Sequence, residues 1–285
     1  MYSAVCITAA YILTKGTHRP LELTAAAVGP DVENVTFQSR VDHLELRGWL
    51  AHSPTRSGRS AILVHGRDSN RVAKDVGALP LARDLLANGY DVLLFDLRAS
   101  GESAGDRFTL GADEPRDLLG AYDFMRGRGY VPARMGIIGW SEGAVILLEA
   151  ASELNAVGAL VADSAFAELR PILDTQIAKN DPLPRIFDWG SITAAHILFG
   201  FDPDLRPVDA VRALPNRAFL FFHGASDETV PPANATELRS TSANPQSEVV
   251  IIPGAGHALG FKTAPDAYLT TLRRFLDEQI TERGG

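Results

Sequence analysis

One serine, Ser141, stands between two glycines in the run Gly139-Trp140-Ser141-Glu142-Gly143. The apolar residues 135–140 before it predict a strand, and residues 142–154 predict a helix after it. A side chain at either glycine position would crowd the tight turn that lifts the serine hydroxyl above a sheet. The pattern therefore predicts that Ser141 is an exposed nucleophile.

The same five-residue pattern occurs a second time, around Ser103, in Gly101-Glu102-Ser103-Ala104-Gly105. There the predicted strand, residues 91–96, ends several residues too early. Residues 106–115 also lack the apolar period of a helix. We expect Ser103 to be a loop residue.

A serine hydroxyl is a poor nucleophile unless a base accepts its proton, and the base needs a partner that fixes its tautomer. His257 is the predicted base, because it follows the apolar strand 248–253 in a glycine-rich loop late in the chain. The other six histidines are expected at surface or turn positions (His18, His43, His52), in helix packing (His196), or as buried rings that brace backbone at strand ends (His65, His223).

The predicted acid is Asp227, which lies just past the predicted strand 217–223. Loops that face ligands gather at the carboxyl ends of strands in open α/β sheets. Asp163 also ends a strand and is an alternative acid, although capping of the following segment explains it more simply. The neighbouring Glu228 is expected to be exposed.

Acyl transfer further needs hydrogen-bond donors aimed at the developing oxyanion, each commonly contributing about 3 kcal/mol. The backbone N–H of Glu142 is one predicted donor, because it follows the nucleophile. The backbone N–H of Arg67, in the loop after an early strand, is the other. The Arg67 side chain is expected either to guard the pocket or to pair with Asp68.

Strands and helices alternate along the chain. Strands are expected at 41–51, 60–65, 91–96, 135–140, 158–163, 217–223 and 248–253, and helices at 72–88, 112–127, 142–154, 233–242 and 263–281. Short connections between alternating elements predict an α/β fold with a mostly parallel sheet, covered by helices on both faces. The two early strands, joined by a polar turn at 53–58, suggest an antiparallel N-terminal edge.

Residues 165–215 are longer than a simple crossover requires and contain many apolar and aromatic side chains. Any single helix there would be broken by Pro171, Pro182, Pro184, Pro203 and Pro207. We therefore expect a small helical cap, with an ordinary long helix on the sheet face as the alternative. The predicted organisation is an N-terminal segment at 1–34 and a catalytic domain at 35–285 that contains the cap. We expect the substrate pocket to be lined by four residues: His65, Gly66, Trp140 and Phe187.

The composition limits the partners. A formal charge of −8 and a pI near 5.4 disfavour nucleic acid, since phosphate binding requires clustered Lys and Arg. The single cysteine, Cys6, excludes an internal disulfide and any multi-cysteine metal site. The charge and apolar content fit a monomer or a homodimer, and they leave the cellular location, cytoplasmic or membrane-associated, undetermined.

Residues 2–14 are apolar or small throughout. Thirteen residues fall short of the roughly 20 that span a bilayer, and no positive residue precedes them as in a secretory signal. Two interpretations remain open: part of a membrane anchor, or a short helix on the protein's own surface near the mouth of the site.

From about Val35 to Thr281 the chain resembles the α/β-hydrolase superfamily, in particular its esterase-like members with a small cap. The resemblance rests on five motifs in order: His65-Gly66, Asp96-Leu97-Arg98 with Ser100-Gly101-Glu102-Ser103, Gly139-Trp140-Ser141-Glu142-Gly143, His223-Gly224 with Asp227 and Val230-Pro231, and Gly256-His257. It implies a Ser-His-Asp triad that acts through an acyl-enzyme without metal or cofactor. Asp68 departs from the small residue that many relatives carry beside the oxyanion loop, so the resemblance implies no charge preference for the acyl pocket.

The expected function is hydrolysis of small carboxylic esters with short to medium acyl chains. A thioesterase or lipid deacylase would use the same triad, and a catalytically silent binding protein on the same fold is the alternative of another class. A peptidase is less favoured, because the chain has no large second domain to select peptides. Serine at the turn disfavours dehalogenase and epoxide-hydrolase chemistry, which use aspartate there in similar folds.

Overall fold

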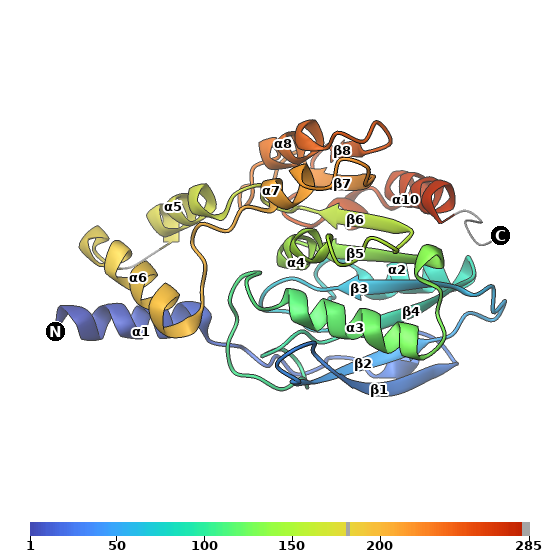
Figure 1. The fold of residues 1–285 in the computed structure, drawn as a ribbon, viewed down its shortest axis with the longest axis horizontal. Helices are drawn as coiled ribbons and strands as arrows, with labels where there is room; N and C mark the ends of the chain where they lie inside the picture. Colours follow the sequence, from blue (N-terminus) through green and yellow to red (C-terminus); the bar gives the residue numbers. More distant parts are fainter. Residues whose placement is uncertain (181–182, 281–285) are drawn as a thin grey trace.

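An eight-stranded sheet runs through the computed structural model, which describes residues 1–180 and 183–280 (Figure 1). The strands are β1 (Val32–Gln38), β2 (Glu45–Ala51), β3 (Arg59–Val64), β4 (Tyr90–Phe95), β5 (Met135–Trp140), β6 (Ala159–Asp163), β7 (Phe219–Gly224) and β8 (Glu248–Ile252). Their order across the sheet is β1-β2-β4-β3-β5-β6-β7-β8. Strands β3 to β8 run parallel, whereas β2 is antiparallel to both β1 and β4. The predicted mostly parallel sheet with an antiparallel N-terminal edge is confirmed.

The antiparallel edge is built differently from the prediction, because β2 pairs with β1 and β4 and not with β3. Strand β1 was not predicted, although Val35 and Phe37 are buried in alternation with exposed neighbours, which is the signal of a half-buried strand. The first predicted strand, 41–51, began too early: Val41 and His43 have φ values of 78° and 55° in a turn, and β2 begins at Glu45. The predicted boundary after residue 34 falls inside β1.

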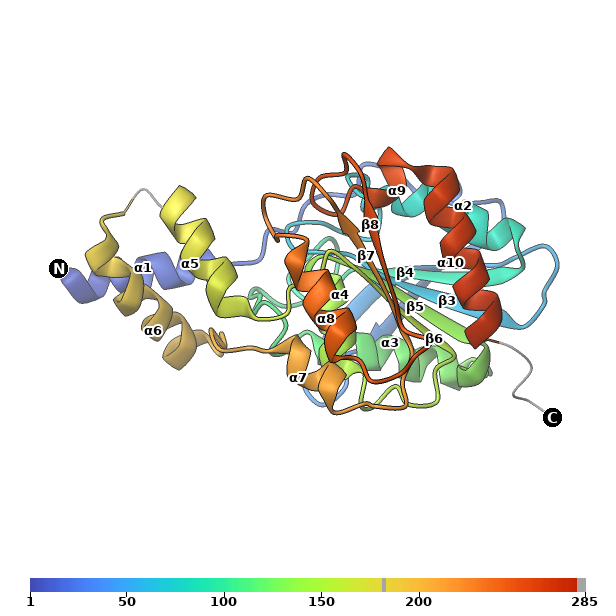
Figure 2. The same cartoon turned by 90° about the horizontal axis from the view of Figure 1, so that it is seen from above.

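Helices cover both faces of the sheet (Figure 2). On one face lie α2 (Ala78–Ala87), α9 (Gly260–Thr263) and α10 (Pro265–Gln279), and on the other α3 (Pro115–Gly127), α4 (Glu142–Ala150), α7 (Pro207–Arg212) and α8 (Ala233–Thr241). Short 3₁₀ turns occur at Ala25–Ala27, Pro132–Arg134 and Arg185–Phe187. Each face of the sheet thus has its own apolar core, which explains why β4 and β5 are buried along their whole length.

Several helices are shorter than predicted. Residues 72–77 form turns, and α2 starts only after Gly77, whose φ of 81° is left-handed. Helix α3 begins at Pro115, a residue favoured in the first helical turn because it has no N–H to satisfy. Helix α4 ends at Ala150, and α10 at Gln279. Thr281, the predicted end of the last helix, lies outside the described residues.

Three helices stand beyond the end of the sheet, and we call them the cap helices (Figures 1 and 2): α1 (Tyr2–Thr14), α5 (Leu169–Asn180) and α6 (Asp188–Phe199). Helix α1 packs along α6, and Tyr2 stacks on Phe187 with ring centroids 5.1 Å apart. A Cβ at Gly190 would overlap the Cys6 sulfur, so glycine allows this close approach. The N-terminal segment is thus packed together with part of the 165–215 region.

Within residues 1–180 and 183–280, every helix is too short or too polar to cross a bilayer.

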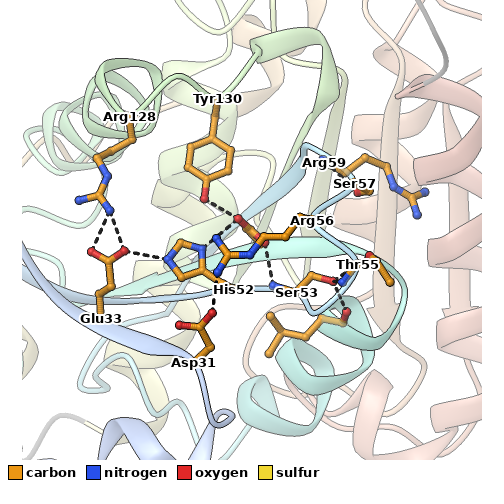
Figure 3. Close-up of polar contacts among 12 residues, drawn as sticks. Asp31, Glu33, His52, Ser53, Thr55, Arg56, Ser57, Arg59, Arg128 and Tyr130 are labelled. Carbon is orange, nitrogen blue, oxygen red and sulfur yellow. Dashed lines mark hydrogen bonds and ion pairs between the residues drawn. The ribbon is translucent and has the colours of Figure 1, made fainter.

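At the end of the sheet that lies away from the cap helices, a polar network joins strands β1, β2 and β4 (Figure 3). The His52 ring, just after β2, bonds to Asp91 of β4 at 3.0 Å and to Glu33 of β1 at 2.8 Å. Asp91 also accepts from the Tyr130 hydroxyl at 2.6 Å, and Glu33 from the Arg128 guanidinium at 2.7 Å. His52 was expected to be a surface or turn residue, and it instead links these strands with a side chain only 9% exposed.

Candidate active site

Ser141 occupies the sharp turn between β5 and α4, with φ 54° and ψ −119°. A left-handed φ is costly for a residue with a side chain, and such strain is typical of functional turns. A Cβ at Gly139 would overlap the Gly143 carbonyl, and one at Gly143 would overlap the Val64 carbonyl of β3. The two glycines therefore let the turn close tightly enough to present the serine hydroxyl.

Three predicted site residues meet at the carboxyl ends of the parallel strands. The Ser141 Oγ lies 2.7 Å from Nε2 of His257, and Nδ1 of the same ring lies 2.7 Å from Oδ2 of Asp227. These distances allow the serine to donate to the imidazole and the imidazole to donate to the carboxylate. The His257 side chain is 24% exposed and the Asp227 side chain is fully buried.

Asp227 is held as a carboxylate by the groups around it. Its Oδ1 accepts from the N–H groups of Thr229 and Val230, both at 2.9 Å. Burial by itself would raise the pKa of Asp227, but hydrogen bonds from His223 and His257, the His257 charge and the Val230 N–H hold that pKa well below its usual range. A permanently ionised Asp227 can stabilise a positive charge on His257.

His223 contributes to the site in a way that the sequence did not reveal. It was predicted as a buried ring that braces backbone, and its Nε2 indeed lies 2.8 Å from the Val230 carbonyl. The same nitrogen is also 3.2 Å from Oδ2 of Asp227. His223 thus fixes the turn that carries Asp227. The one sign of this role in the sequence is that His223 stands four residues before Asp227.

The competing serine and acid have other partners. The Ser103 hydroxyl donates to the Asp96 carbonyl at 2.6 Å and accepts from the Arg47 N–H at 2.9 Å, in a loop as predicted. Asp163 accepts from the hydroxyls of Ser164, at 2.9 Å, and Tyr268, at 3.0 Å. The structure therefore brings His257 together with Asp227 and leaves Asp163 to neighbouring hydroxyls.

Both predicted oxyanion donors lie beside the serine. Glu142 is the first residue of α4, where backbone N–H groups have no partner within the helix and the helix dipole favours negative charge. Arg67 follows Gly66, and a Cβ at Gly66 would be 3.7 Å from the Ser141 Oγ. The loop that carries the Arg67 N–H thus runs alongside Ser141.

The Glu142 side chain forms an unusual part of the site. The residue is 3% exposed, and neither carboxyl oxygen has a hydrogen-bond partner. Burial, reinforced by the nearby Glu114 charge, raises the pKa of Glu142 well above its usual range. Glu114, by contrast, accepts from the N–H groups of Thr109, at 2.7 Å, and Gly111, at 2.8 Å. The two buried acids thus differ in their surroundings, because Glu114 accepts hydrogen bonds and the Glu142 oxygens have no partner.

The triad opens into an apolar pocket of about 520 Å³ that Ser141, Glu142, Arg67 and His257 share. Helix α5 supplies one wall, made by four residues: Leu169, Ile172, Leu173 and Ile177. The remaining apolar lining comes from four separate elements: Leu13, Leu110, Phe166 and Val230. An apolar pocket with a few polar groups is the usual form of a small-molecule site.

Three of the four residues predicted to line the pocket lie elsewhere. Trp140 packs in the core on the α10 face, 1% exposed, because alternate residues of β5 point to opposite sides of the sheet. His65 is buried and accepts from the Leu97 N–H at 3.1 Å. Phe187 stacks on Tyr2 within the cap helices. Gly66 does lie against Ser141, as described above.

A metal ion would need several neighbouring donors. Across residues 1–180 and 183–280, no three His, Cys, Asp or Glu side chains are grouped so that they could hold one.

The sheet, the helices on both faces and the serine turn after β5 define the α/β-hydrolase fold. Solved structures of this fold superimpose on most of the chain. The Pyrococcus furiosus esterase Pf2001 matches with a TM-score of 0.78 at 22% identity, over 93% of this chain and 99% of that one. The esterase RhEst1 from Rhodococcus sp. ECU1013 matches with a TM-score of 0.62 at 19% identity, over 86% and 99%.

Residues 82–283 match the model of the prolyl oligopeptidase family, and the chain belongs to that family. The uncharacterized protein YfhR of Escherichia coli strain K12 is 25% identical over 243 residues, which is 82% of this chain and 77% of YfhR. The protein is thus a serine hydrolase of the α/β-hydrolase fold, and it resembles esterases in structure.

Proposed function

We propose that the protein hydrolyses carboxylic esters of short to medium acyl chains through an acyl-enzyme intermediate. One observation carries the proposal: a chain of two hydrogen bonds, each 2.7 Å long, joins Ser141 Oγ to His257 and His257 to Asp227. This chain lies beside an apolar pocket. In this geometry, a nucleophile, a base and an acid are hydrogen-bonded in the order that acyl transfer requires.

In the first half-reaction, Ser141 Oγ attacks the acyl carbonyl carbon while its proton passes to Nε2 of His257. The negative charge on the carbonyl oxygen is stabilised by the N–H groups of Glu142 and Arg67. The bond from carbon to the leaving oxygen then breaks, and His257 returns the proton to the departing alcohol. Asp227 keeps the ring oriented and offsets its positive charge.

In the second half-reaction, water attacks the acyl-enzyme and His257 accepts its proton. The carbon–Oγ bond breaks, Ser141 regains a proton from His257, and the carboxylic acid leaves. The apolar lining from α5 and Leu13 supports an acyl group rather than a charged one as the part held beside the serine.

Intact-mass detection of fluorophosphonate labelling tests the nucleophile. Wild type and Ser103→Ala should each gain one adduct, whereas Ser141→Ala should gain none. Ser103→Ala is the matched control, since Ser103 stands in the same five-residue pattern. An unlabelled wild type would reject the proposal in favour of a silent binding protein.

A thioesterase or lipid deacylase remains the second candidate, because the triad geometry fits either leaving group. Oxyester and thioester substrates with the same acyl group separate the two. A higher kcat/KM on the thioester across the series would favour the second candidate.

We also propose that residues 2–14 form a surface helix at the mouth of the site. The packing of α1 on α6 and the position of Leu13 in the pocket support this role. Membrane association through α1 stays a prediction, and co-sedimentation with phosphatidylcholine vesicles measures it directly. Sedimentation velocity distinguishes the monomer from the homodimer.

A further inference from the structure

A second apolar hollow lies along α1, next to the active-site pocket. Its volume is about 590 Å³, and apart from Met1 and Leu183 it is lined by α1 residues: Ala4, Val5, Thr8, Ala9, Ile12 and Leu13. These positions recur every three or four residues, so they form one continuous face of the helix.

That face is largely apolar and partly exposed. The run Tyr2–Thr14 contains no charged residue, and the Ile12 residue is 66% exposed. The opposite side of α1 is already used, because Cys6, Ala10 and Thr14 are buried. At its end, Leu13 packs against the core, whereas Ala4, Thr8 and Ile12 are exposed along the hollow.

The two hollows meet at one residue. Leu13 lines both the active-site pocket and the hollow along α1. The position of Leu13 is fixed by the loop beside Ser141, because the Arg67 guanidinium donates to the Leu13 carbonyl at 2.6 Å. A chain that leaves Ser141 past Leu13 reaches the α1 face without crossing a charged side chain of α1.

We propose that the α1 face, from Leu13 to Ala4, binds the distal part of a long acyl chain whose carbonyl is held at Ser141. This inference rests on the proposed ester hydrolysis and extends its substrate class from short and medium to long acyl chains. The nine residue-to-residue steps from Ala4 to Leu13 offer a track of about 13 Å. The distal part of the acyl chain is covalently part of the substrate. The observation that selects it as the occupant is that Leu13 lines both hollows.

The test is a chain-length series of p-nitrophenyl esters, from butyrate through decanoate to tetradecanoate, used below their critical micelle concentrations. Burial of each additional methylene raises kcat/KM by roughly fourfold at most. Wild type should therefore prefer decanoate and tetradecanoate over butyrate.

Ala9→Glu places a charge in the groove, and Ile7→Glu places the same charge on the other side of α1, where Ile7 is 46% exposed and outside the lining. Ala9→Glu should lose the preference for tetradecanoate by about tenfold or more while butyrate turnover persists, since a charge opposes burial of the chain. Ile7→Glu should keep the wild-type profile. Ala9→Trp, which fills the groove without charge, should shorten the preferred chain in the same way.

Unchanged chain-length profiles in Ala9→Glu and Ala9→Trp would overturn the inference. So would equal losses in Ala9→Glu and Ile7→Glu, which would indicate adsorption of the whole helix to the ester rather than a groove. Absence of butyrate turnover in wild type would instead reject the proposed ester hydrolysis itself.

Discussion

The guanidinium of Arg67 donates a hydrogen bond to the carbonyl oxygen of Leu13 at 2.6 Å. This contact ties the end of α1 to the loop that runs beside Ser141. Arg67 also lies 3.5 Å from Asp68, so both roles considered for its side chain, at the pocket and in an ion pair, have a structural counterpart. Helix α1 is therefore linked by a hydrogen bond to the loop that is predicted to bind the oxyanion.

Replacing the Arg67 side chain should loosen α1 while leaving the backbone N–H in place. A hydrogen bond from a charged donor contributes about 1.5–3 kcal/mol, and partial exposure of Arg67 reduces that to about 1 kcal/mol. Arg67→Ala should raise KM several-fold and speed limited proteolysis between α1 and β1. Asp68→Asn is the control, because it removes the ion pair but not the bond to Leu13. Equal proteolysis rates in Arg67→Ala and wild type would contradict the prediction.

Replacing the acid should separate the two candidate aspartates. Asp227→Asn leaves His257 without an anionic partner and should lower kcat by about 10³–10⁴. Asp163→Asn should retain most of its kcat, because Asp163 bonds to Ser164 and Tyr268 rather than to His257. Steady-state kinetics on p-nitrophenyl butyrate, with circular dichroism to verify folding, decides between them. A larger loss in Asp163→Asn would reassign the acid.

The buried carboxyl of Glu142 should make stability depend on pH. Burial raises the pKa of Glu142 above its ordinary value of 4.5, so the folded protein keeps a proton that the unfolded chain releases. Folding is therefore progressively disfavoured as pH rises above 4.5 towards the folded-state pKa. Glu142→Gln cannot ionise, and it should match wild type near pH 4 but exceed its unfolding free energy by about 1 kcal/mol or more at pH 8.

Urea unfolding at the two pH values measures this difference, with Glu228→Gln as the control because Glu228 is exposed, as predicted. A constant difference between Glu142→Gln and wild type across pH would show that Glu142 does not hold a proton in the folded state.

The network around His52 should stabilise the sheet edge in a different pH range (Figure 3). Burial lowers the pKa of His52, but hydrogen bonds with Asp91 and Glu33 outweigh it and raise that pKa above its ordinary value of 6.5. A raised histidine pKa contributes stability that is complete below pH 6.5 and is lost as pH rises through the folded-state pKa. The pKa values of Asp91 and Glu33 are lowered, so both acids are ionised throughout this range.

His52→Gln should therefore lose about 1 kcal/mol of unfolding free energy at pH 6, and less at pH 9. Arg56→Gln, which removes the exposed pair with Asp31 beside the network, should change little at either pH. A loss in His52→Gln that grows with pH would have the wrong sign and would refute the linkage.

The sequence alone was enough to predict features that depend on residues close together in the chain. The turn at Ser141 is set by two glycines and by the apolar runs on either side, all within a short stretch of chain. The central strands β4 and β5 could be predicted for the same reason, since a strand buried on both faces is apolar along its length. The assignment of Asp227 and His257 as partners of Ser141 could also be predicted, because the motifs stand in the chain order serine, acid, histidine.

Only the tertiary structure determined which distant residues meet. Phe187 could have faced the substrate, but it stacks on Tyr2, and α1 lies on α6 beside the pocket. Apolar attraction has no direction, so a sequence can mark Phe187, Tyr2 and Leu13 as buried or apolar without saying which of them will be partners. The raised pKa of Glu142 also depends on the tertiary structure, because it comes from burial beside Glu114 rather than from the place of Glu142 in the chain.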